Sequence, residues 1–296
     1  MALYSIGSLI IESDILPLSY KPFLINNIHD KKVDLHIKRV KSISYTSHQL
    51  KRVAELPSLF ISKEVMTDNP HLIFEPKNGI CTFQVDDNYK NIDYFCSAIL
   101  SSINKSERDN IINSFLKIII ECKLVQKDIL TLHSSCIEHN EIAYAFVGPS
   151  GIGKSTRAGN WCELLNANWI SGDRPIIDVN RGMVFGAPWD GKEKVFRNYN
   201  CPLSVILSVK RSKTTFIKEL TDKEKLQILC EQSFFPMWDT VLVMKAFAAI
   251  RRLIKTIPIY ELNCDITDES TIQSINIIGQ VIDYQKLKHR QNGLDF

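Results

Sequence analysis

The chain has 296 residues, of which 45% are hydrophobic, so it can bury a full core as one large domain or two ordinary ones. Its net charge of +3 comes with small, dispersed basic clusters rather than a basic stripe, which argues against a nucleic-acid partner. No apolar run approaches the ~20 residues that cross a bilayer, so we expect no membrane partner. No secretion signal is evident and the eight cysteines lie far apart, so we expect a cytoplasmic protein with reduced thiols.

Residues 1–128 predict a small α+β domain. Short β-like runs at residues 4–11, 33–43 and 80–85 are separated by Pro, Asn and Asp residues that favour turns. Apolar residues recur at helical spacing between residues 106 and 127, which predicts a helix that leads into the second half. Because this half carries no catalytic motif, we expect it to recognise a substrate or to act as a scaffold.

Residues 129–284 predict an α/β domain that opens with the order strand, loop, helix, strand, so the fold class of the whole chain is α+β. Strands are expected at residues 130–137, 142–147, 169–171, 176–179, 183–186, 203–209 and 257–262. Helices are expected at residues 154–166, 222–231, 239–255 and 268–282. The polar tail, residues 285–296, is expected to fray.

A glycine-rich loop follows the strand at residues 142–147. Gly148, Gly153, Lys154 and Ser155 satisfy the pattern G-x-x-x-x-G-K-[ST], and a predicted helix follows, as a phosphate-binding loop requires. In such a loop backbone N–H groups surround the phosphates, the lysine reaches the β/γ oxygens and the serine can ligate Mg²⁺. The residues expected to bind nucleotide are Gly148, Pro149, Ser150, Gly151, Ile152, Gly153, Lys154, Ser155 and Thr156. The alternative is a Gly-rich turn that merely connects a strand to a helix.

An aspartate follows the next strand. Asp173 comes directly after residues 169–172, at the end of the strand where the γ-phosphate of a bound nucleotide is expected. Its carboxylate could hold magnesium or take the proton of a hydroxyl. The alternative is an aspartate that initiates the turn before Pro175.

Three stretches carry a resemblance to a known family. They are Leu132-His133-Ser-Ser-Cys136, Phe146-Val147-Gly-Pro-Ser-Gly-Ile-Gly-Lys-Ser155 and Ile170-Ser-Gly-Asp173-Arg174. In order and spacing they resemble the HPr serine kinase/phosphorylase family and its relatives in peptide-modification clusters, and more distantly the ATP-dependent phosphoenolpyruvate carboxykinases. The resemblance covers roughly residues 130–265. Gly186-Ala-Pro-Trp-Asp-Gly-Lys-Glu193 and the opening Tyr4-Ser-Ile-Gly with Ile11-Glu-Ser-Asp-Ile-Leu-Pro17 are similar to segments of those kinase-like relatives.

The resemblance implies a catalytic domain like the C-terminal domain of HPr kinase, with Mg-ATP as the phosphate donor. It also implies that His133 and Asp173 assist transfer to a serine hydroxyl. The family usually carries two adjacent aspartates, whereas this chain has Gly172-Asp173, so it is open whether Asp173 is the base or a metal ligand. For His133 the alternative is a histidine satisfied within its strand.

Charged residues between the strands at residues 183–186 and 203–209 could complete the site. Lys192 and Arg197 are candidate catalytic cations beside Lys154, because transfer of a phosphoryl group spreads negative charge over its oxygens. Glu193 is a candidate magnesium ligand with Ser155 and Asp173. The alternative is a solvated charged loop.

These observations favour a cytoplasmic kinase that uses Mg-ATP, or another nucleoside triphosphate with Mg²⁺, to phosphorylate a Ser or Thr hydroxyl of a protein or ribosomally made peptide. One alternative is a kinase of a small hydroxylated metabolite, since the same loop and carboxylate would serve it. Another is a nucleotide-binding regulator without transfer activity, because the second aspartate is missing. The acceptor, the use of GTP or pyrophosphate and the formation of a homo-oligomer stay open.

Overall fold

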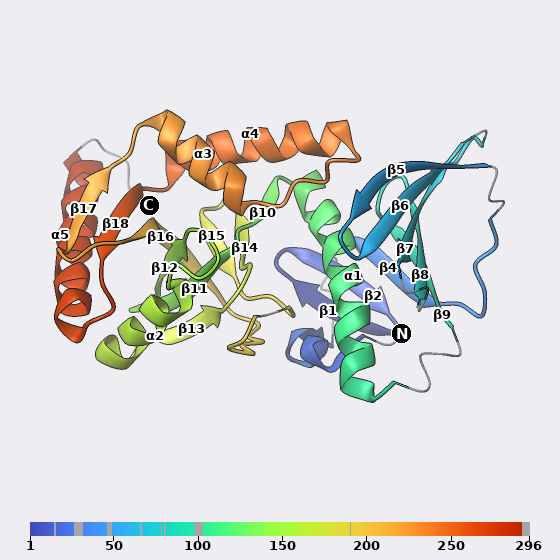
Figure 1. The fold of residues 1–296 in the computed structure, drawn as a ribbon, viewed down its shortest axis with the longest axis horizontal. Coiled ribbons are helices and arrows are strands. Elements are labelled where there is room, and N and C mark those ends of the chain that lie inside the picture. The colour runs from blue at the N-terminus through green and yellow to red at the C-terminus, as the bar shows by residue number, and fades with distance from the viewer. Residues whose placement is uncertain are drawn as a thin grey trace. The chain divides into compact units, whose positions relative to one another are not determined.

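The computed structural model describes residues 1–14, 16–26, 32–45, 49–65, 67–77, 79, 81–97, 103–189 and 191–291. For residues 284–291 it describes the backbone only. Within these residues the chain is a mixed α/β protein with two mixed β-sheets, five α-helices and one 3-10 helix (Figure 1). It divides into an N-terminal unit, Met1–Ile129 with Phe235–Ala246, and a C-terminal unit, Leu130–Phe234 with Phe247–Phe296. Among the described helices, none is long and apolar enough to cross a membrane.

The N-terminal unit is built on a nine-stranded sheet in the order β3-β1-β2-β4-β9-β8-β7-β6-β5. Its elements are β1 (Ala2–Ile6), β2 (Leu9–Ser13), the 3-10 helix η1 (Leu18–Phe23), β3 (Leu24–Ile25), β4 (Leu35–Arg39), β5 (Leu50–Leu56), β6 (Leu59–Glu64), β7 (His71–Pro76), β8 (Cys81–Asp86), β9 (Asn91–Cys96) and α1 (Lys105–Gln126). Strand β4 lies parallel to both β2 and β9. Helix α1 contributes Phe115, whose ring lies 5.7 Å from that of Phe83 on β8, so its apolar face packs on the sheet.

Two sequence predictions for this unit need correction. The run at residues 4–11 is a hairpin, β1 and β2, rather than one strand, because Gly7 takes a positive φ of 59° and turns the chain. The run at residues 33–43 shortens to β4, while the helix predicted at residues 106–127 is confirmed as α1. The run at residues 80–85 corresponds to β8, and its first residue, Ile80, lies outside the described residues, as does Ile15 of the N-terminal segment.

The C-terminal unit contains the second sheet, in the order β10-β14-β15-β16-β12-β11-β13, with β18 paired to β16 and β17 to β18. Its elements are β10 (Ile129–Thr131), β11 (Ser134–His139), β12 (Ile142–Val147), α2 (Lys154–Leu165), β13 (Asn168–Ser171), β14 (Ile176–Asp178), β15 (Met183–Phe185), β16 (Asn200–Arg211), β17 (Phe216–Glu219), α3 (Asp222–Gln232), α4 (Thr240–Thr256), β18 (Ile259–Cys264) and α5 (Asp268–Gln291). Strands β12, β16 and β18 are parallel, whereas β11 is antiparallel to β12 and β13. Helix α4 begins in the N-terminal unit and ends here.

A buried tryptophan fixes α2 in place. Trp161 is 1% exposed, and its ring lies 5.3 Å from that of Tyr144 and 5.2 Å from that of Phe146, both on β12. Its Nε1 donates to Ser274 Oγ of α5 at 3.1 Å. Figure 1 shows α2 beside β13 and α5 beside β17 and β18. Because α2 is locked to both β12 and α5, the first turn of α2 is held at a defined place on the sheet.

Most predicted elements of this unit have close counterparts, and the exceptions have physical causes. The strand expected at residues 130–137 is interrupted, because Leu132 forms an isolated bridge with Ser233 and the His133 N–H donates to the Gln232 carbonyl at 2.7 Å. Strand β17 has no counterpart in the sequence prediction. Helix α5 continues to Gln291 through most of the tail expected to fray, a stretch rich in good helix formers; residues 292–296 lie outside the described residues. The boundary expected near residue 128 lies beside Ile129, but Phe235–Ala246 group with the N-terminal unit.

Candidate functional site

Strand directions bring the chemically distinctive segments of the C-terminal unit to one edge of its sheet. The glycine-rich loop follows the C-terminal end of β12. Strand β11 is antiparallel, with Ser134 opposite Val147, so the start of β11 and the preceding His133 lie at that same edge. Strand β13 is antiparallel to β11, with Ser171 opposite Cys136, so its end, and Asp173 beyond it, return there.

The loop after β12 has the backbone of an anion-binding turn. Gly148, Gly151 and Gly153 have positive φ angles of 142°, 77° and 108°. At Gly148 a side chain would also be crowded, since a Cβ would meet Ile152 Cγ2 at 3.2 Å and the Val209 carbonyl at 3.4 Å. Helix α2 starts directly after Gly153 with no side-chain cap among the described residues. Its first N–H groups therefore remain available to an anion.

Lys154 lies under this loop. The residue is 8% exposed, and its Nζ donates to the carbonyl oxygens of Gly148 at 2.9 Å and Pro149 at 3.2 Å. Burial lowers the pKa of the Lys154 ammonium, and the carboxylate of Asp173 acts in the opposite direction. The Lys154 ammonium is thus held at the loop, where it interacts electrostatically with the Asp173 carboxylate.

A serine that the sequence analysis did not single out connects three of these segments. Ser135 of β11 is fully buried; its hydroxyl donates to the Gly172 carbonyl at 3.2 Å and lies 3.2 Å from Ser155 Oγ. Because Ser135 has one hydroxyl proton, donating it to Gly172 makes Ser155 the donor in the second bond. The bonds orient the Ser155 hydroxyl and tie the start of α2 to the turn that carries Asp173. In the sequence, the only indication that Ser135 belongs to the site is its position directly after His133-Ser134.

His133 and Asp173 form a pair. His133 Nε2 lies 3.8 Å from Asp173 Oδ1, and the two side chains are 34% and 28% exposed. This separation is within ion-pair range and too long for a hydrogen bond between these two atoms. The pair is partly open to solvent, so an added hydroxyl group can approach it.

The turn after β13 is fixed by its own hydrogen bonds. Ser171 Oγ donates to the Asp173 carbonyl at 2.8 Å, and Arg174 has a positive φ of 52°. Trp189 is 3% exposed and its Nε1 donates to the Arg174 carbonyl at 2.9 Å, so this indole packs against the turn. These contacts hold the backbone on both sides of the Asp173 carboxylate.

The charged loop at residues 186–197 meets the site at one point. A Cβ on Gly191 would lie 3.4 Å from both Asp173 Cβ and Glu193 Oε2, so Glu193 reaches the neighbourhood of Asp173. Arg197 is directed elsewhere, with its Nη1 donating to the Trp169 carbonyl at 3.2 Å and its guanidinium 4.1 Å from the Tyr199 ring. Lys192 is exposed on the loop surface, and Asp190 lies outside the described residues.

The remaining loop residues lie at the surface or in the first turn of α2. Pro149, Ser150, Gly151 and Thr156 are exposed, and Ile152 is half-buried. The described part of the chain contains no group of three or more His, Cys, Asp or Glu side chains that could hold a metal ion. A magnesium ion at this edge would therefore draw its protein ligands from Ser155 and the carboxylates near Gly191, with phosphate and water oxygens filling the other positions.

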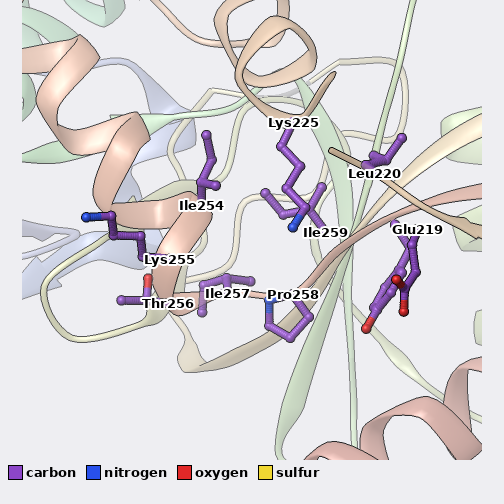
Figure 2. A pocket seen from close by; sticks show the side chains of 10 residues that line it. Glu219, Leu220, Lys225, Ile254, Lys255, Thr256, Ile257, Pro258 and Ile259 are labelled. Carbon is purple, nitrogen blue, oxygen red and sulfur yellow. The ribbon is translucent and has the colours of Figure 1, made fainter. Parts of the chain in front are cut away.

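A separate pocket of about 250 Å³ lies at the opposite end of β18. Figure 2 shows it around Pro258 and Ile259, where β18 begins, with the Lys225 side chain pointing toward them and Glu219 and Leu220 on the other side. None of the residues named as site candidates from the sequence lines it.

No protein-family model matches this chain, and a comparison with curated proteins found none similar to it.

Proposed function

We propose that this protein is a kinase that transfers the γ-phosphate of Mg-ATP to a Ser or Thr hydroxyl of a protein or ribosomally made peptide. The observation that carries the proposal is the meeting of the glycine-rich loop, Lys154 and the His133–Asp173 pair at one edge of the sheet. The resemblance to HPr kinase supplies the acceptor class and would make this unit a phosphate-binding kinase domain.

The loop and Lys154 would bind the triphosphate. Lys154 Nζ now bonds two loop carbonyls, and these weak bonds can be exchanged for charged phosphate oxygens. The backbone N–H groups at the start of α2 add positive potential for the same anion. Magnesium, held by Ser155 and a nearby carboxylate, would neutralise charge that develops on the phosphates.

Asp173 would act on the acceptor. Its carboxylate takes the proton of the acceptor hydroxyl while the hydroxyl oxygen bonds to the γ-phosphorus, the bond to the β–γ bridging oxygen breaks, and ADP leaves. His133, 3.8 Å away, orients the carboxylate or the acceptor. Because one carboxylate stands beside Gly172, Asp173 serves either as base or as metal ligand, and Glu193 near Gly191 is available for the second role.

The test is transfer of labelled phosphate from ATP to the small peptides encoded beside the gene. We expect Asp173→Asn to lower kcat by about 100-fold or more, because the substitution keeps size but removes charge and basicity. His133→Ala should cost less, and the double variant should lose less than the product of the single losses, since the pair acts as a unit. Asp222→Asn is the control, because the Asp222 side chain is 88% exposed at the start of α3.

An Asp173→Asn enzyme within about threefold of the parent would remove Asp173 from the mechanism. A nucleotide-binding regulator is the alternative that the single carboxylate favours. It would bind ATP and yield no labelled acceptor of any kind, whereas a metabolite kinase would label small hydroxylated molecules and no peptide.

A further inference from the structure

A second cavity adjoins the glycine-rich loop. It has a volume of about 670 Å³, within the range of small-molecule sites. The loop residues Gly151 and Ile152 form one side, the end of β16 at Arg211 another, and the end of β18 at Cys264 and Ile266 a third. Because β12, β16 and β18 are parallel, their C-terminal ends gather these segments at the edge that also carries the loop.

The cavity and Asp173 lie on opposite sides of the loop. Along the sheet, β11 and β13 flank β12 on one side and lead to Asp173, whereas β16 and β18 flank it on the other and lead to the cavity. A triphosphate bound at the loop with its γ-phosphate toward Asp173 thus has its α-phosphate end toward the cavity. The group attached to the α-phosphate would enter it.

The walls of the cavity suit a flat ring. Ile152, Val209, Cys264 and Ile266 supply apolar surface, and Ile266 is 65% exposed, which leaves a large aliphatic side chain open at the rim. A ring that lay on Ile266 would remove this apolar area from water. Trp189 is buried with its Nε1 bonded to the Arg174 carbonyl, so it offers no comparable face.

Polar groups are fixed around these walls. Arg157 is 2% exposed and its Nη1 donates to Thr271 Oγ1 at 2.9 Å, while its Nε has no hydrogen-bond acceptor among the described residues. The Arg157 guanidinium is therefore held in place beside the cavity. Arg211 Nη2 donates to the Gly151 carbonyl at 2.8 Å, so the cavity rim is tied to the loop.

We infer that this cavity binds the nucleoside, base and ribose together, of the triphosphate held by the glycine-rich loop. The inference rests on the proposed function, in which the loop binds that triphosphate. Ile266 then determines how much affinity the base adds to that of the phosphates alone.

The test compares two ligands, ATP and inorganic tripolyphosphate, both with Mg²⁺, by calorimetry on the full chain. We expect Ile266→Ser to raise the Kd for ATP by about 5- to 10-fold through loss of apolar contact, and to leave the Kd for tripolyphosphate unchanged. Ile266→Leu keeps the apolar area and should bind ATP like the parent. Ile272→Ser removes an isoleucine that is 48% exposed on α5 and is not among the residues that line the cavity, so it should change neither Kd.

The outcomes separate the two proposals. If Ile266→Ser leaves the Kd for ATP unchanged, or raises both Kd values equally, the nucleoside does not lie on Ile266 and the inference is wrong while the kinase proposal stands. The inference is also wrong, and the kinase proposal also stands, if the parent protein binds tripolyphosphate as tightly as ATP. If the parent binds neither ligand, both proposals fail.

Discussion

Replacing Gly186 by alanine tests how closely the loop after β15 approaches its neighbours. A Cβ at Gly186 would lie 1.9 Å from the carbonyl oxygen of Arg197 and 3.1 Å from that of Ile170. Relief of the first contact requires the two backbone segments to separate by about 1 Å or more. Overpacking costs about 1–3 kcal/mol, and we expect at least about 3 kcal/mol because the obstacles are backbone atoms that cannot rotate away. For a unit of this size that corresponds to a Tm lower by about 6–12 °C.

Thermal unfolding followed by tryptophan fluorescence measures this effect, since Trp161, Trp169 and Trp189 all lie in the C-terminal unit. The matched control is Gly279→Ala on α5, where a Cβ meets no described heavy atom within 4 Å. Alanine there should raise stability by about 1 kcal/mol through its helix propensity. A Gly186→Ala protein that unfolds within about 2 °C of the parent would refute the packing argument.

Three further outcomes follow. Lys154→Ala should raise the Kd for tripolyphosphate by about 10- to 100-fold in calorimetry, because the loop loses the charged hydrogen bonds of the lysine but keeps its backbone N–H groups. An unchanged Kd would exclude the loop as the phosphate site. Thr221→Ala should lower the Tm by about 2–4 °C, because the Thr221 hydroxyl accepts from the Glu224 N–H in a capping box of α3; the Tm of Thr221→Ser should stay near the parent's. The hydrogen bond from Lys218, and then those from Thr221, lower the pKa of the Glu224 carboxyl from 4.5 to about 2. The stability that Glu224 contributes is therefore complete above about pH 4.5 and is lost as the pH falls through 2. NMR titration of the Glu224 carboxyl checks this pKa, and a midpoint near 4.5 would contradict it.

Helices could be predicted from the sequence because their signal is local. The apolar spacing between residues 106 and 127, which predicts α1, is contained within a few helical turns. Strands were harder, since their ends depend on partners far along the chain. The interruption at Leu132 and His133 arises from bonds to Ser233 and Gln232, about 100 residues later, and no local pattern contains that information.

The same distinction applies to the candidate site. The loop was recognisable because its glycines and Lys154 stand next to one another in the sequence. Ser135 was missed because its importance comes from two contacts across the fold, to Ser155 and to the Gly172 carbonyl. Arg197 has the right charge for a phosphate ligand, but its guanidinium is engaged by Trp169 and Tyr199.

The return of Phe235–Ala246 to the N-terminal unit determines how this chain can be cut. Within that unit Trp238 lies edge-on to Phe74 with ring centres 6.0 Å apart, its Nε1 donates to the Tyr89 hydroxyl, and Lys245 Nζ donates to the Gln126 carbonyl. A recombinant fragment that starts at Leu130 would expose Trp238 to solvent and leave the first turns of α4 without their packing partners. Supplying residues 1–129 as a second polypeptide would restore those partners, so co-expression of two fragments is the better route to a protein divided at this boundary.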